Sequence, residues 1–142
     1  MRFEFSAGGI VYKKWGDKVM VLVAQHSQHH GWVFPKGLIG DHSKGESKEN
    51  AATREVEEET GVSAKILKPL DPVAYWYVFD KEKRKKTVYY YLMEFVSEDQ
   101  SVKDMEMENV EWLELKDVEN RLTYPSDKKV WKQALEILNL KF

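Results

Sequence analysis

The chain has 142 residues, 42% of them hydrophobic, which suits one globular domain over residues 1–142 with a single core. Its 22 basic and 24 acidic residues nearly cancel to −2, so overall charge does not imply nucleic-acid binding. The absence of cysteine excludes disulfides, thiolate zinc sites and thiol nucleophiles. Carboxylate, imidazole and backbone oxygen remain as metal ligands, and oxygen-rich sets favour Mg²⁺ or Mn²⁺.

The N-terminal residues from Met1 to Phe5 are too polar for a signal peptide. No apolar run approaches the length of a transmembrane segment. We therefore expect a cytoplasmic protein without a membrane partner, either a monomer or a weak dimer.

The first predicted element is a hairpin. Phe3–Tyr12 and Lys18–Gln25 are rich in Val, Ile and aromatic residues, and Trp15–Asp17 supplies the turn between them. A polar segment then leads into a glycine-containing loop at Leu38–Glu46. This loop precedes the most informative stretch of the chain.

A short helix is predicted next. The hydroxyl of Ser47 can cap free backbone N–H groups at its start, and Gly61 suits the left-handed position just past its end. Ala52 and Val56 fall on one arc of this helix and can pack against a sheet. The neighbouring arc of the helix does not pack against the sheet and can hold functional side chains.

That arc carries Glu55, Glu58 and Glu59 at positions i, i+3 and i+4, which lie on one face of a helix. Negative charge in the last turn meets the negative end of the helix dipole, and like charges at this spacing repel one another. The bland alternative is a solvated acidic face. The functional interpretation is a face that attracts a divalent cation.

The remaining elements follow the same rules. A second hairpin is expected around the charged turn Asp80–Lys86, and Ser97–Asn109 is expected to be a loop. Tyr124–Ser126 introduces a C-terminal helix with an apolar stripe in which Trp131 belongs to the core. The predicted strands are Val62–Leu67, Val73–Phe79, Thr87–Val96 and Val110–Leu115.

The acidic helix belongs to a longer pattern, which reads Gly40-x5-Glu46-x7-Arg54-Glu55-Val56-x-Glu58-Glu59-x-Gly61-Val62. These residues match the Nudix box, and over nearly its full length the chain resembles the Nudix hydrolase superfamily. The resemblance implies an α/β fold, an α/β/α sandwich around a mixed sheet. It also implies hydrolysis of a nucleoside diphosphate linked to another moiety, with Mg²⁺ or Mn²⁺ required.

By this resemblance Glu55, Glu58 and Glu59 hold the metal ions. Arg54 can pair with Glu46 or with a neighbouring helix carboxylate and so hold the acidic cluster in shape. The alternative for Arg54 is an ordinary i, i+4 pair with Glu58.

The chain departs from the family pattern before the helix. The glycine of Pro35-Lys36-Gly37 lies nine residues before Glu46, whereas Gly40 restores the formal spacing. We interpret Leu38–Lys44 as carrying a three-residue insertion. The resemblance implies that either Gly37 or Gly40 supplies a backbone carbonyl to metal, and Gly37 is the favoured choice.

Within the superfamily the flanking residues resemble the asymmetrical diadenosine tetraphosphate hydrolases, which implies cleavage to ATP and AMP. The residues that carry this second resemblance are His29-His30, Pro35-Lys36-Gly37, Tyr75-Trp76-Tyr77, Lys86-Thr87-Val88, Tyr89-Tyr90-Tyr91-Leu92 and Glu106 before Trp112-Leu113.

Glu106 is the leading candidate for a further metal ligand or for the base that activates water, because it lies in a polar loop able to close over phosphate. Glu108 and Glu111 compete for this role, and Glu58 could also be the base. Arg54 completes the predicted catalytic set.

Phosphate contacts are predicted for Lys36, which follows a rigid proline, and for Lys83 and Lys86 in the charged turn. A solvated hairpin tip is the alternative for the turn as a whole. Stacking on adenine or hydrogen bonding is predicted for Tyr77, Tyr90 and Tyr124, and His30 can reach phosphate or the leaving group.

The expected partner is thus a small nucleotide, with nucleic acid disfavoured. Other enzymatic interpretations keep the metal site but change the substrate to a nucleoside triphosphate or an RNA 5′ end. The non-enzymatic interpretation is a Nudix-fold nucleotide sensor. Retention of Glu55, Glu58 and Glu59 opposes it, because a sensor does not need so many mutually repelling carboxylates.

Overall fold

The computed structural model describes residues 1–40, 43–102 and 106–142. Its described strands join into one mixed sheet with the path β3-β2-β1-β7-β5, to which β4, β6 and β8 attach at β1, β7 and β2. The strands are β1 (Arg2–Trp15), β2 (Lys18–His26), β3 (Trp32–Val33), β4 (Lys36–Leu38), β5 (Val62–Pro69), β6 (Val73–Phe79), β7 (Glu82–Glu98) and β8 (Met107–Glu114).

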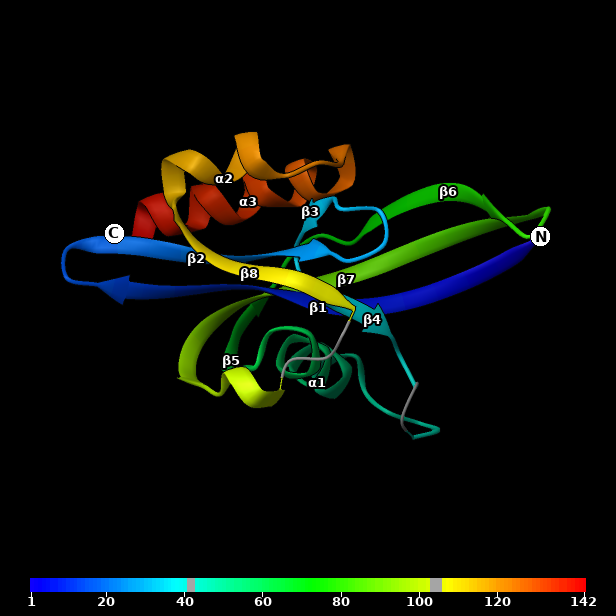
Figure 1. The fold of residues 1–142 in the computed structure, drawn as a ribbon, viewed down its shortest axis with the longest axis horizontal. Coiled ribbons are helices and arrows are strands. Elements are labelled where there is room, and N and C mark those ends of the chain that lie inside the picture. The colour runs from blue at the N-terminus through cyan, green and yellow to red at the C-terminus, as the bar shows by residue number, and fades with distance from the viewer. Residues whose placement is uncertain (41–42, 103–105) are drawn as a thin grey trace.

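The centre of the sheet is the parallel pair β1–β7, whose register runs from Arg2 opposite Arg84 to Tyr12 opposite Glu94. The first predicted hairpin is confirmed, but β1 pairs with β2 only through the four residues of β1 from Tyr12 to Trp15. Nearer its start, β1 pairs instead with the short strand β4 at residues 6–8. The two long strands therefore diverge, and β4 occupies part of the space between them (Figure 1).

Helices cover both faces of this sheet (Figure 1). Helix α1 (Lys48–Thr60) lies on one face, while α2 (Leu115–Arg121) and α3 (Pro125–Lys141) lie on the other; a short 3₁₀ helix, η1, spans Gln100–Val102. Strand alternation supplies both interfaces, because Ile10 faces the α3 side and Val11 faces α1. The predicted α/β/α sandwich around a mixed sheet is confirmed.

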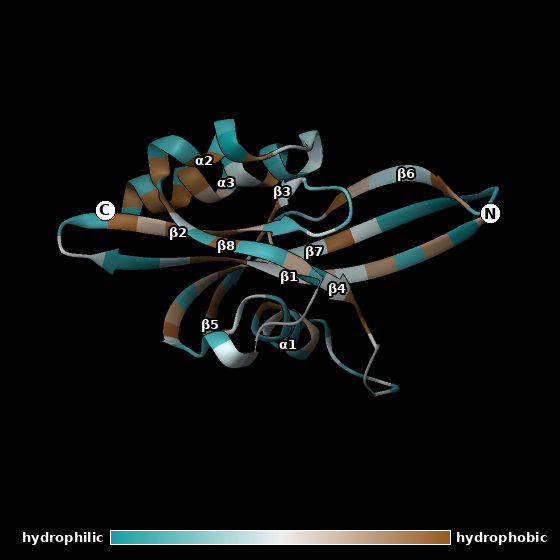
Figure 2. Cartoon of the chain, in the orientation of Figure 1, coloured by the Kyte–Doolittle hydropathy of each residue, from teal (hydrophilic) through white to brown (hydrophobic). Residues whose placement is uncertain are grey.

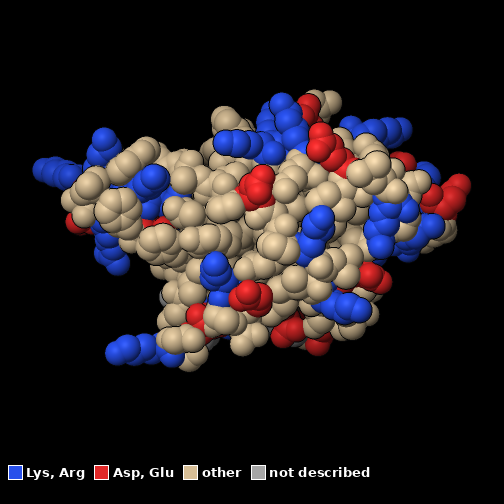
Figure 3. All heavy atoms as spheres, turned by 180° about the vertical axis from the view of Figure 1, so that it is seen from behind, with Lys and Arg blue, Asp and Glu red and all other residues tan. Residues whose placement is uncertain are grey.

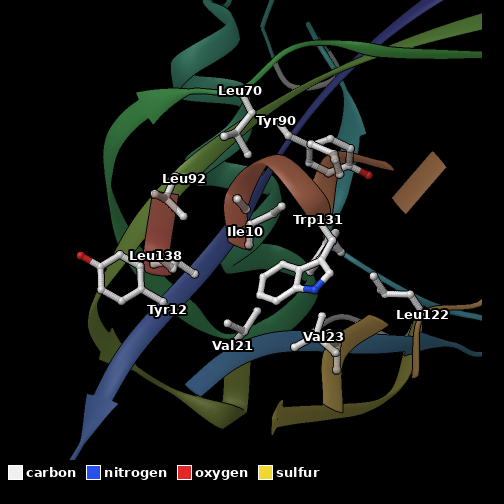
Figure 4. Packing of buried hydrophobic residues seen from close by; sticks show 14 of the residues in the cluster. Ile10, Tyr12, Val21, Val23, Leu70, Tyr90, Leu92, Leu122, Trp131 and Leu138 are labelled. Carbon is white, nitrogen blue, oxygen red and sulfur yellow. The ribbon is translucent and has the colours of Figure 1, made fainter. Parts of the chain in front are cut away.

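The larger core lies between the sheet and α3. Figure 4 shows Trp131 of α3 among Ile10, Val21 and Val23 of the sheet, and the Trp131 side chain is only 1% exposed. Its expected place in the core is confirmed. In the second core, Ala52 and Val56 of α1 are fully buried, as their arc on the helix predicted.

The ends of α1 also follow the sequence. The Ser47 hydroxyl accepts a hydrogen bond from the Asn50 backbone N–H at 3.1 Å, and Gly61 ends the helix with a φ of 77°. The helix thereby presents its last turn, with the glutamates, to the edge of β4. In Figure 2 the N-terminal part of β1 alternates between brown and teal, whereas β7 begins with a continuous teal stretch.

Several short elements differ from the sequence-based expectation. The turn predicted at residues 80–86 contracts to Asp80 and Lys81, which adopt positive φ, and β7 begins at Glu82. Strand β8 begins at Met107, so the loop before it is shorter than predicted. Helix α2 lies between the predicted strand at Val110–Leu115 and the predicted C-terminal helix, where no element was predicted. Such elements are too short for residue periodicity to identify, and pairing or packing with distant parts of the chain defines them.

Within the residues described, no helix is both long and apolar enough to cross a membrane. Lys and Arg side chains are spread over the rear face and gather around the outer end of the β6–β7 hairpin (Figure 3). This local enrichment contrasts with the net charge of −2 for the chain.

Candidate active site

A groove runs across the edge of the sheet where β1 and β2 diverge. It consists of two adjoining cavities of about 370 and 550 Å³ that share His29, Val33, Lys36, Tyr75 and Lys86. The first cavity is polar and includes carboxylates from α1. The second is mainly apolar and extends to Tyr77, Tyr124 and Asp127. One continuous groove therefore joins a charged end to an aromatic end.

Arg54 organises the acidic residues at the charged end. Its Nε and Nη2 atoms lie 2.7 and 2.8 Å from the two carboxylate oxygens of Glu46, a bidentate pair. Its Nη1 atom lies 2.8 Å from Glu55 and 3.2 Å from Glu58. Hydrogen bonding to Glu46, offset in part by burial, raises the pKa of Arg54. Arg54 thus makes both kinds of contact that the sequence left as alternatives.

Glu55 lies directly against the backbone of β4. A Cβ atom added to Gly37 would come within 2.1 Å of the Glu55 carboxyl carbon, so only glycine permits this approach. Gly40 differs in having a φ of 84°, and an added Cβ there would meet only the Ser43 carbonyl oxygen, at 3.9 Å. The Gly40 N–H donates to Glu46 at 3.0 Å. The close approach favours Gly37 over Gly40 as the glycine that borders the acidic cluster.

Glu59 is the most deeply buried member of the cluster, with 2% exposure. Its Oε1 accepts a hydrogen bond from the Lys36 backbone N–H at 3.1 Å. Burial, together with the negative charges of Glu106 and Glu55, holds the pKa of Glu59 well above its ordinary value. A positive ion in this cavity would relieve both effects.

The donor set fits a hard divalent cation in its chemistry. Glu55 and Glu59 line the charged cavity together with Glu106, and Glu58 lies beside them on the same helix face. In the part of the chain that the structure describes, no three acidic, His or Cys side chains are already gathered closely enough to hold a metal ion. The Arg54 guanidinium instead bonds Glu55 and Glu58, which offsets part of their mutual repulsion.

Glu59→Gln is expected to stabilise the metal-free protein at neutral pH by about 1 kcal/mol, the scale of a buried polar group. Because the pKa of Glu59 is raised in the folded state, the folded chain binds its proton more tightly than the unfolded chain. Stability contributed by Glu59 is therefore present below the unfolded pKa and lost as pH rises through the folded pKa. Thermal unfolding between pH 4 and 8 measures this slope.

The control for this experiment is Glu136→Gln, which changes an exposed carboxylate on α3. It should leave the pH slope unchanged, whereas Glu59→Gln should flatten it. An unchanged slope in Glu59→Gln would show that this carboxyl is not the group that destabilises the fold at neutral pH.

Two lysines face the groove. The surroundings of Lys36 oppose its charge by burial, but Tyr75, Asp127 and Glu59 outweigh this and raise the pKa of Lys36. Burial and the positive charge of Lys36 lower the pKa of Lys86. The two ammonium groups therefore repel one another across the groove, and an anion between them would stabilise both.

Lys83 lies outside the groove, contrary to the prediction. Residues 82–86 form a strand, so Lys83 and Lys86 point to opposite faces of the sheet. The Lys83 ammonium lies 4.8 Å from the Trp76 ring centroid. Lys86 lines the groove and Lys83 does not.

The predicted tyrosines separate into two groups. Tyr77 and Tyr124 line the aromatic end of the groove, where the Tyr77 hydroxyl donates to Glu4 and the Tyr124 hydroxyl lies 2.9 Å from His29 Nδ1. The base contact predicted for Tyr90 is wrong, because its side chain is 2% exposed in the core. Its hydroxyl donates instead to Asp127 at 3.2 Å.

Sequence reasoning also placed the wrong histidine in the site. His30 is not among the groove residues, and its Nδ1 pairs with the Glu108 carboxylate. His26 and His29 line the charged cavity. Asp127, a buried carboxylate at the start of α3, was also missed. No local pattern distinguishes these residues, although an acidic residue in the first turn of a helix is ordinary capping chemistry.

Among the candidate bases, Glu106 lines the charged cavity. The carboxylate of Glu111 pairs with Arg121 instead, and that of Glu108 pairs with His30. Neither of these two glutamates lines the groove. The structure thus separates Glu106 from its two competitors.

Known proteins are similar to this chain in sequence and in fold. The family model described as NUDIX domain matches residues 3–135. A crystal structure of a Caenorhabditis elegans Ap4A hydrolase in a binary complex is similar with a TM-score of 0.77 and 25% identity, over 96% of this chain and 98% of that chain. The fold therefore has an established structural relative.

Two curated relatives extend the comparison. The MutT4 protein of Mycobacterium tuberculosis is 36% identical over 108 residues, which are 76% of this chain but 42% of that protein. The asymmetrical bis(5′-nucleosyl)-tetraphosphatase of C. elegans is 29% identical over 114 residues, 79% of this chain and 80% of that protein. Since the family model covers residues 3–135, the chain belongs to the NUDIX domain family.

Proposed function

We propose that this protein hydrolyses a phosphoanhydride bond in a nucleoside diphosphate linked to another moiety, and that its substrate is diadenosine tetraphosphate, cleaved to ATP and AMP. One observation carries the proposal: a single groove joins carboxylates and two lysines at one end to tyrosines at the other. The similarity to a C. elegans tetraphosphatase over 80% of its length supports this choice of substrate.

Nudix enzymes generally use divalent metal ions, usually Mg²⁺. Here Glu55, Glu58 and Glu59, with the Gly37 backbone carbonyl, would hold Mg²⁺ or Mn²⁺. When bound, the ion supplies neutralisation of charge on the phosphate oxygens. Arg54 keeps the carboxylates in position through its contacts with Glu46, Glu55 and Glu58.

The side chains of this chain supply the remaining functions. Lys36 and Lys86 bind the anionic phosphate chain between them. Tyr77 and Tyr124 contact the base or ribose, since base stacking on an aromatic ring is worth about 1–3 kcal/mol. Water attacks one bridging phosphorus, the P–O bond to the leaving phosphate breaks, and the water proton passes to Glu106 or Glu58.

A turnover panel with Mg²⁺ tests the proposal. The panel contains diadenosine tetraphosphate, nucleoside triphosphates, ADP-ribose and 5′-triphosphorylated RNA. We expect diadenosine tetraphosphate to have the highest kcat/KM of these substrates. Mass spectrometry of products formed in ¹⁸O-water identifies the attacked phosphorus, because either the AMP or the ATP gains the label. The mass-balanced products must be ATP and AMP.

Each competing result has a defined meaning. A preference of tenfold or more for a triphosphate, for ADP-ribose or for RNA would replace the proposed substrate with that class. Tight nucleotide binding without turnover of any panel member would indicate a sensor and would reject the hydrolytic function.

A further inference from the structure

The turn between β2 and β3 makes several contacts with the loop that carries Glu106. The turn is closed by backbone hydrogen bonds from His26 N to Gly31 O and from His30 N to His26 O, both 2.9 Å long. Ser27 then fixes the backbone of Glu106, because its N–H and its hydroxyl both donate to the Glu106 carbonyl at 2.9 Å. The position of the Glu106 backbone is therefore set by this turn.

The ring of His26 lies close to the carboxylate of Glu106. His26 Nε2 lies 3.4 Å from Glu106 Oε1, and both side chains line the charged cavity. The Nδ1 atom of His26 accepts a hydrogen bond from the Gln28 backbone N–H at 3.1 Å. Neutral imidazole carries one proton, so Nδ1 as acceptor leaves the proton on Nε2, the ring nitrogen that lies 3.4 Å from Glu106 Oε1.

The orientation of the His26 ring is itself supported. His29 stacks on it with ring centroids 4.1 Å apart and an angle of 7° between the planes. His29 Nδ1 accepts a hydrogen bond from the Gly31 N–H at 3.0 Å and lies 2.9 Å from the Tyr124 hydroxyl. A chain of contacts thus runs from α3 through two imidazole rings to Glu106.

We propose that His26 is a positioning residue that directs the Glu106 carboxylate toward the phosphate in the groove. The Glu106 side chain is 56% exposed, and His26 Nε2 at 3.4 Å is a nitrogen donor at the wall of the same cavity that can orient the carboxylate. The 15% exposure of the His26 side chain makes the ring a firm support for that purpose. This inference rests on the proposed hydrolytic function, with Glu106 as the group that accepts the proton.

A double-mutant cycle tests the inference. His26→Phe keeps a ring for stacking on His29 but removes the N–H donor, and we expect it to lower kcat about tenfold with little change in KM. His26→Gln retains a donor of similar reach and should recover most of the activity. In a Glu106→Gln background, His26→Phe should change kcat by less than about twofold, because His26 acts through the Glu106 carboxylate that is already lost.

Two further variants make the result decisive. His26→Asn keeps an acceptor for the Gln28 N–H but is too short to reach Glu106, so it should show the same loss of about tenfold in kcat. It keeps the inference testable if His26→Phe does not fold. Lys18→Gln, at the far end of β2 beside Glu114, is the control and should keep wild-type kcat. Circular dichroism and thermal unfolding establish that each variant is folded.

The inference would be overturned if His26→Phe lowered kcat by the same factor in the wild-type and Glu106→Gln proteins. It would also be overturned if Glu106→Gln alone left kcat unchanged. The cycle is run on whichever substrate the panel shows to be turned over fastest. A wrong assignment of diadenosine tetraphosphate therefore leaves the test of His26 intact, and a failed cycle leaves the substrate assignment intact.

Discussion

Glu58→Gln is expected to lower kcat by about 10²–10⁴-fold while leaving the fold intact. Glu58 is the most exposed of the three helix carboxylates, with 33% side-chain exposure against 7% for Glu55. Whether it holds the ion or accepts the proton from water, glutamine cannot replace the lost negative charge. Arg54 keeps its contacts with Glu46 and Glu55, so the cluster retains most of its structure.

The matched control is Glu57→Gln on the same helix. Glu57 is exposed, its carboxylate accepts a hydrogen bond from Ser63, and it does not line the groove. Its replacement should leave kcat within about twofold of wild type, as expected for a surface change. Steady-state rates, thermal unfolding and Mn²⁺ titration followed by electron paramagnetic resonance separate loss of ion binding from loss of fold. Near-normal turnover by Glu58→Gln would reject the metal and base assignments together.

Gly37→Ala is expected to lower kcat/KM by about 10²-fold, the loss typical of a catalytic group displaced by about 1 Å. The new methyl group would lie 2.1 Å from the Glu55 carboxyl carbon, so the carboxylate must move. Glu55 is 5% exposed and bonded to Arg54, which leaves it little space in which to relax. The end of a glutamate side chain is more adaptable than backbone, so we expect activity to suffer more than stability.

Two other glycines complete this experiment. Gly16→Ala introduces positive-φ strain at φ 67° in the β1–β2 turn, with no atom within 4 Å, and should reduce stability by about 1 kcal/mol or more without affecting kcat/KM. Gly40→Ala tests the alternative assignment, because Gly40 also has a positive φ and borders Glu46 through its N–H. A larger activity loss in Gly40→Ala than in Gly37→Ala would transfer the role to Gly40.

The local elements were largely predictable from sequence. The caps at Ser47 and Gly61 identified both ends of α1, and Val73–Phe79 coincides with β6. Both are segments in which residue type and local spacing determine the structure. Strand β4 was not predicted, because three residues of extended chain become a strand only through their pairing with residues 6–8 of β1.

Assignments of function to single side chains were less secure, because strands alternate between faces. The charged segment at residues 80–86 was predicted as a turn, in which Lys83 and Lys86 could both reach phosphate. As a strand it directs them to opposite faces. Tyr90 lies on the face that packs against α3, so its aromatic ring belongs to the core.

The sequence by itself determined the acidic face of α1, since the spacing of Glu55, Glu58 and Glu59 needs only helical geometry to bring them together. Only the tertiary structure decided which lysines, tyrosines and histidines share the groove with them. The groove forms where β1 and β2 diverge around β4, and its walls come from segments far apart in the chain. Local periodicity cannot encode such meetings, because they depend on strand register and on which face of the sheet each helix covers.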